Sequence, residues 1–130
     1  MGLFSFLNKS SESKDKLVDW LKTVDQAYSK SFQVKNATSL GEYLTRPCLV
    51  KQMERIRIGE KAYAGLDRYK HVKWEKQAPV GESLVYLKIV TYDQVKMSRG
   101  IVAPVGEAYN ERWCIIQDNG KYKVAEIRRI

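Results

Sequence analysis

The stretch that decides the fold reads AYNERWCIIQ (108–117), DNG (118–120) and KYKVAEI (121–127). Apolar and polar residues roughly alternate on both sides of Asn119-Gly120, and an Asn-Gly pair supplies the positive φ angles that a tight turn requires. We therefore predict a β-hairpin here. The rest of the chain has to pack against the sheet to which this hairpin belongs.

Before the hairpin, the period of the apolar residues predicts several further strands. From His71 onward it is close to two residues, as in a strand, with a turn around Pro79. The part 83–92 is largely apolar on both faces, so we expect both of its faces to be covered. The expected strands are 71–75, 83–97 and 101–103, followed by a break at 104–106.

Upstream of His71 the period is that of helices. A helix is predicted over 15–32, a short one after the capping-box pattern that begins at Ser39, and a third over about 46–58 with Pro47 in its first turn. Helices followed by strands predict an α+β fold: N-terminal helices packed on a curved antiparallel sheet of four to five strands.

The length of 130 residues fits one domain, 15–130, after a flexible N-terminal tail, 1–14. No apolar run approaches the roughly 20 residues that span a bilayer. The apolar residues of 3–7 leave open that the tail dips into a membrane surface or a partner groove. We expect a cytoplasmic protein that could also sit at the membrane periphery.

The element order resembles the nuclear transport factor two-like superfamily and the related domain of the mitochondrial import-motor anchor. The resemblance rests on the long first helix, on Tyr63-Ala64-Gly65-Leu66-Asp67-Arg68-Tyr69 leading into Trp74, and on the final hairpin from Trp113 to Ile127. It implies a cone-shaped fold in which the sheet wraps around the helices and leaves an apolar pocket. Enzymes and binding modules both use such a fold, so the resemblance alone assigns no function.

Candidate catalytic groups are few. His71 is the only histidine, and Asp93 follows Tyr92 on the long strand. Either could act as a base in an isomerase or dehydratase, with Glu111 or Glu126 on the hairpin as comparable groups, but none lies in a recognisable catalytic motif. A partly exposed surface histidine is the simpler interpretation of His71. The two cysteines, Cys48 and Cys114, are far apart and predict no disulfide, and no metal or cofactor motif is present.

Aromatic residues are the candidates for a ligand pocket. Most aromatic side chains on helices and strands form plain core, but the excess of tyrosine over phenylalanine leaves hydroxyls that need partners or water. This favours a partly wet cavity or an interface. The pocket candidates are Tyr28, Tyr63, Tyr69, Trp74, Tyr92 and Trp113.

Positive charge is concentrated in residues 46–76, which hold nine basic and four acidic residues and so carry +5 of the total net charge of +8. We expect one positive flank, suited to an acidic protein or an anionic surface. The pattern lacks the motifs that accompany nucleic-acid binding. The predicted basic surface comprises Arg55, Arg57, Lys61, Arg68, Lys70 and Lys73.

These observations favour a non-enzymatic interaction domain of bacterial type, an adaptor or assembly component with a basic flank and an apolar pocket. Its expected partner is a protein or an anionic surface, with a homodimer through the sheet and a small apolar ligand left open. The alternative is the small-molecule enzyme that would use Asp93 or His71. No cofactor is predicted.

Overall fold

The computed structural model describes residues 2–59, 70–92, 94–96, 102–104 and 108–130, and it describes side chains within 16–59, 70–92 and 108–130. The helices are α1 (Gly2–Val34), the 3-10 turn η1 (Thr38–Leu40) and α2 (Arg46–Arg57). The strands are β1 (Lys70–Val80), β2 (Ser83–Tyr92), β3 (Gln94–Lys96), β4 (Val102–Pro104), β5 (Tyr109–Asp118) and β6 (Lys121–Arg129).

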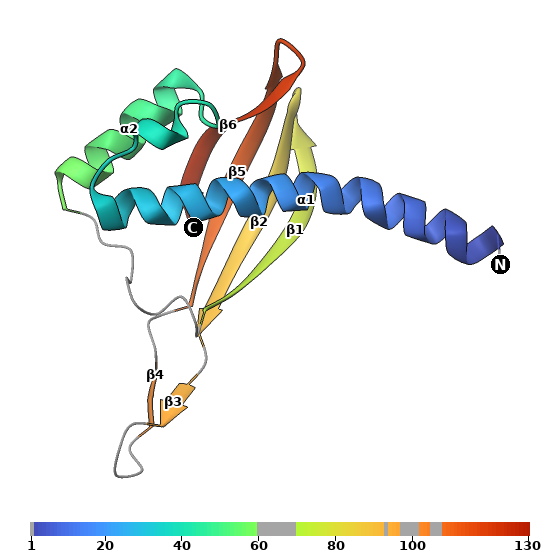
Figure 1. Cartoon of the computed structure of the whole chain (residues 1–130), viewed down its shortest axis with the longest axis horizontal. Helices are drawn as coiled ribbons and strands as arrows, with labels where there is room; N and C mark the ends of the chain where they lie inside the picture. The colour runs from blue at the N-terminus through green and yellow to red at the C-terminus, as the bar shows by residue number, and fades with distance from the viewer. Residues whose placement is uncertain (1, 60–69, 93, 97–101, 105–107) are drawn as a thin grey trace.

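Four of the strands form one antiparallel sheet in the order β1-β2-β5-β6, and β3 pairs with β4 separately. Helix α1 crosses the sheet, and α2 lies on the side of β6 (Figure 1). The predicted α+β class is therefore confirmed, with two α-helices packed against an open four-stranded sheet.

The final hairpin forms as predicted. Asn119 and Gly120 have φ angles of 53° and 78°, and strands β5 and β6 pair from Asp118 and Lys121 outward. A register shift at Cys114 and Ile115 keeps the apolar residues of both strands on the face that α1 covers. The core cluster joins α1 to this face through Leu21, Val24, Tyr28, Tyr86, Trp113, Ile115, Val124 and Ile127.

Two of the three predicted helices differ from the structure, and the third is confirmed. The predicted helix 15–32 lies inside α1, which begins at Gly2, so residues 2–14, predicted as a tail, belong to the helix. The capping box at Ser39 does not form: Ala37 is the N-cap of η1 without a side-chain bond, and the segment continues into a bridge with β6. The third helix is confirmed as α2, whose first turn is capped by the Thr45 hydroxyl and contains Pro47.

Strand boundaries also differ. Strand β1 continues through Pro79, which was expected in a turn, because the other edge of β1 pairs with no described strand and a missing backbone N–H is tolerated there. The turn falls instead at Gly81, with a φ angle of 57°. Strand β2 ends at Tyr92 and β3 covers Gln94–Lys96, so the predicted strand 83–97 is divided.

Residues 83–92 were expected to be covered on both faces, and the structure differs from this expectation. Helix α1 covers one face of β2, but no described helix or strand covers the other, where Val85 is nevertheless buried and Leu87 and Ile89 are half-buried. None of the helices in the described part of the chain is long and apolar enough to cross a membrane. The cone shape stays a prediction.

Two glycine substitutions test the hairpin turn. Gly120→Ala forces alanine into a positive φ angle and should cost about 1–2 kcal/mol of the free energy of unfolding. Gly41→Ala is the control, because Gly41 has a right-handed φ angle of −59° and the added methyl group meets only Thr38 O at 3.4 Å, an ordinary contact. Urea denaturation measures both, and an equal loss in the two variants would contradict this account of the turn.

Candidate functional site

A buried lysine, Lys88, lies at the centre of the molecule between α1 and the sheet. Its relative exposure is 0 %, and its ammonium lies 2.5 Å from Asp25 Oδ1 of α1 and 3.2 Å from Glu111 Oε1 of β5. The same ammonium lies 5.4 Å and 5.6 Å from the ring centroids of Tyr28 and Trp113. Such contacts replace the water that a lysine loses on burial.

Glu111 is bonded at both of its carboxylate oxygens. Oε1 also accepts from the Trp113 indole N–H at 3.3 Å, and Oε2 accepts from the Tyr28 hydroxyl at 3.0 Å. The Tyr28 oxygen in turn accepts from Arg55 of α2 at 3.3 Å, and Arg55 donates to the Ile127 carbonyl of β6 at 2.8 Å. This buried network therefore ties both helices to three strands.

The protonation states of the network follow from these contacts. Burial alone would lower the pKa of Lys88, but the carboxylates of Glu111 and Asp25 outweigh it and hold the pKa above the ordinary lysine value. Burial, helped by the negative charge of Glu111, raises the pKa of Tyr28 well above 10. At neutral pH Lys88 is thus charged and the Tyr28 hydroxyl is neutral, so each serves as a hydrogen-bond donor.

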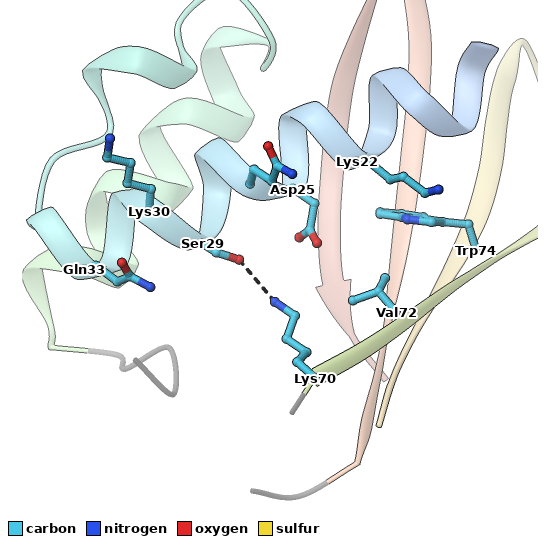
Figure 2. Close-up of a pocket in the computed structure, with 9 residues that line it drawn as sticks. Lys22, Asp25, Ser29, Lys30, Gln33, Lys70, Val72 and Trp74 are labelled. Carbon is cyan, nitrogen blue, oxygen red and sulfur yellow. Dashed lines mark hydrogen bonds between the residues drawn. The ribbon is translucent and has the colours of Figure 1, made fainter. Parts of the chain in front are cut away.

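A groove of about 460 Å³ opens beside this network, between α1 and the first half of β1. Figure 2 shows Asp25 and Ser29 of α1 facing β1, with Lys70 donating to the Ser29 hydroxyl at 3.4 Å. Because residues two apart on a strand share a face, β1 contributes Lys70, Val72 and Trp74 to one wall. The α1 wall comprises Lys22, Asp25, Gln26, Ser29, Lys30 and Gln33.

Three lysines and one carboxylate line this groove, and the carboxylate of Asp25 is already paired with Lys88 beneath it. The groove is therefore positive. Trp74 gives it an apolar wall, packs edge to face on Trp113 at 5.0 Å between ring centroids, and keeps a buried indole N–H without a hydrogen-bond partner among the described residues. The site can attract an anionic group and offers one donor and an apolar surface beside it.

Two other cavities are less suited to a specific ligand. One, of about 480 Å³, lies between the end of α1 and α2, beside exposed Met53. The other, of about 550 Å³, lies at the turn end of the hairpin around Leu84 and Tyr122. Neither of them touches the buried network or gathers lysines as the α1/β1 groove does.

The predicted catalytic candidates that the structure describes, His71, Glu111 and Glu126, lie on three different strands. His71 is exposed on β1, offset by one residue from the groove-lining Lys70 and Val72 and so on the opposite face. Asp93 lies outside the described residues. Glu111 is buried beside the Tyr28 hydroxyl, whereas Glu126 is half-buried on β6.

The predicted aromatic pocket is in part a packed cluster. Tyr28 and Trp113 are buried and lie edge to face at 5.6 Å, and Trp74 joins them at the groove. Tyr92 is half-buried at the end of β2. Tyr63 and Tyr69 lie outside the described residues.

In the described part of the chain, residues 46–59 and 70–76 lie at the two edges of the sheet, and the single basic flank stays a prediction. Helix α2, with Arg55 and Arg57, packs beside β6, whereas Lys70 and Lys73 lie on β1 at the opposite edge. Arg55 takes part in the buried network, and Arg57 pairs with exposed Glu54. Lys61 and Arg68 lie outside the described residues.

Sequence reasoning missed Asp25 and Lys88. Asp25 is 7 % exposed and lies four residues after Leu21 and three before Tyr28, on the face of the helix that packs on the sheet. Lys88 interrupts an apolar run, at even spacing from Tyr86 and Val90, which are both buried. A charged residue on the apolar face of α1 and another on the apolar face of β2 were the available signal, because two buried charges of opposite sign are expected to pair.

The cysteines behave as small apolar residues, as expected. Cys48 is buried in the core, and its burial raises the pKa of its thiol to about 11. Burial also raises the pKa of the half-buried Cys114 thiol. Both side chains are therefore protonated thiols at neutral pH, which is unfavourable for a nucleophile.

Comparison of the chain with protein-family models, curated proteins and solved structures gives no match. The resemblance to the nuclear transport factor two-like superfamily therefore stays a prediction.

Removing the buried ammonium tests the network. Lys88→Met should cost about 3–5 kcal/mol of the free energy of unfolding, because it leaves two buried carboxylates without their cation. Lys73→Met is the matched control: Lys73 pairs with Glu75 at 3.2 Å, but its side chain is 73 % exposed, so the loss should be about 0–1 kcal/mol. Denaturant titration at pH 7 decides, and similar small losses for both lysines would refute a central role for Lys88.

The raised pKa values predict the response to alkali. A raised lysine pKa contributes stability that is complete below the unfolded-state value of about 10.4 and is lost as pH rises through the folded-state value. The raised Tyr28 pKa acts in the same direction from about pH 10 upward, because only the unfolded chain then loses that proton readily. Stability should therefore fall above about pH 10.

Tyr28→Phe should flatten this alkaline loss, although the variant is less stable at pH 7. Tyr122→Phe, at an exposed position on β6, should leave the slope unchanged. The measurement is the denaturation midpoint of each variant between neutral and alkaline pH. Parallel curves for the three proteins would show that Tyr28 does not carry the dependence.

Proposed function

We propose that this chain is a non-enzymatic binding domain whose α1/β1 groove holds an acidic segment of a partner protein. The observation that carries the proposal is the gathering of Lys22, Lys30 and Lys70 around one groove whose single carboxylate, Asp25, is already paired. A groove of this charge raises the local concentration of an acidic partner and speeds its encounter.

The apolar wall favours a polypeptide as the ligand. Val72 and Trp74 offer apolar contact beside the lysines, so one ligand would place carboxylates and aliphatic groups side by side. Acidic protein segments carry both. The Trp74 indole N–H, which has no partner among the described residues, would donate to an oxygen of the ligand.

The buried network supports binding by holding the groove in shape. The buried ion pair between Asp25 of α1 and Lys88 of β2 fixes the helix on the sheet to which β1 belongs, so the groove is already organised before the partner arrives, which lowers the entropy cost of association. The two free thiols fit a reducing compartment, so the proposal places this domain in the cytoplasm.

The enzyme alternative receives less support from the geometry. Its proposed base, His71, is on the other face of β1 from the groove. The buried pair of Glu111 and Tyr28 could resemble an acid and base, but Glu111 already accepts three hydrogen bonds, and the pKa of Tyr28 is raised well above 10 by burial. Proton transfer at neutral pH requires pKa values closer to 7.

Charge reversal tests the proposal. The variant Lys22→Glu/Lys30→Glu should bind a synthetic decapeptide of alternating Glu and Val roughly tenfold more weakly or worse, since two exposed attractive charges become repulsive. The matched control is Lys51→Glu/Lys121→Glu, which changes the net charge equally at exposed positions on α2 and β6.

Titration calorimetry at low salt measures both variants, and thermal unfolding confirms that they stay folded. Equal weakening in both would mean that only the net charge matters. Binding of phosphatidylserine vesicles with dependence on Lys22 and Lys30, without peptide binding, would assign the groove to lipid and overturn the proposal of a protein partner.

A further inference from the structure

We propose that the acidic partner segment binds as an added β-strand along the free edge of β1. The inference rests on the proposed function and specifies how the ligand lies in the groove. It requires an extended segment with carboxylates at alternate positions, so that its backbone pairs with β1 while its acidic side chains reach the lysines of the groove.

The first observation is the position of β1 at the edge of the sheet. Strand β1 pairs with β2 from Lys70 to Gln77, and its other edge faces no strand in the described part of the chain. Every second residue of such a strand directs its backbone N–H and C=O outward. These groups are complementary to another polypeptide backbone, and neither a lipid head group nor a nucleic acid supplies the matching ladder.

The opposite edge of the sheet is protected. There the Thr45 N–H donates to the Val124 carbonyl at 3.0 Å, and the Val124 N–H donates to the Tyr43 carbonyl at 2.8 Å. The segment before α2 thus forms a short parallel bridge with β6. Of the two edges, β1 is the one at which the described structure leaves a ladder available.

The second observation is that the groove follows this edge. Lys70, Val72 and Trp74 are alternate residues of β1, and α1 faces them across the groove (Figure 2). A strand added beside β1 would direct one set of its side chains toward α1, where Lys22 and Lys30 lie. The backbone of the added strand would then pair with β1, and its acidic side chains would pair with the lysines of α1.

Charge selects the occupant. Residues 70–76 contain three lysines and one glutamate. A second copy of this chain pairing through β1 would bring lysines of both copies together, which destabilises cross-strand pairs. Lysines on an edge strand oppose self-association in this way, whereas an acidic strand would neutralise them. The observations therefore favour an acidic segment over a homodimer at this edge.

The experiment uses the full chain and three forms of the Glu/Val decapeptide: unmodified, N-methylated at every Glu, and N-methylated at every Val. N-methylation removes backbone donors from one edge of an extended peptide and leaves its charges intact. Since only one edge of the peptide can face β1, one methylated series should bind roughly tenfold more weakly or worse, and the other should bind like the unmodified peptide. A Lys/Val decapeptide is the charge control and should not bind.

Amide hydrogen exchange followed by NMR gives the readout on the protein. The unmodified peptide should slow the exchange of alternate β1 amides between Lys70 and Lys76, with little change on β6. Equal binding of both methylated series, or no new protection on β1, would overturn strand addition while leaving acidic-segment binding intact. Failure of the unmodified peptide to bind would overturn the proposed function itself.

Discussion

The requirement to keep Lys88 charged inside the molecule constrains the rest of the structure. A buried ammonium is stable only where carboxylates and aromatic faces replace its water, and these come from Asp25, Glu111, Tyr28 and Trp113. Asp25 belongs to α1 and Trp113 to β5, which are far apart in sequence. Satisfying one charge therefore sets the distance and rotation of α1 over β2 and β5.

The groove follows from that placement. Because Asp25 must reach inward to Lys88, the residues next to it on α1, Lys22 and Ser29 among them, face the first half of β1. Asp25 contributes to the groove wall but has its charge balanced from below, so the outer lysines determine the sign of the site. Lys88 neutralises Asp25 from inside the core, so the positive charge of the groove lysines is not cancelled.

Local signals predicted much of this fold, and tertiary contacts account for the rest. Positive φ angles at Asn119 and Gly120 and the apolar period of α2 act within a few residues, and both predictions are confirmed. Pro79 suggested a turn, but an edge strand tolerates it. Asp25 and Lys88 were missed because each depends on the other across 63 residues, and the basic segment was divided because the strand order separates α2 from β1.

Trp74 has a consequence for optical experiments. The chain has three indoles: Trp113 is fully buried, Trp20 packs against Tyr43 and Tyr122 at another part of the core, and Trp74 borders the groove. A ligand that accepts a hydrogen bond from the Trp74 N–H would shift the emission of that indole, and Trp20, which contacts neither Trp74 nor the groove in the described structure, would serve as the internal reference. The protein therefore carries its own fluorescent reporter of groove occupancy, with Trp74→Phe as the blank.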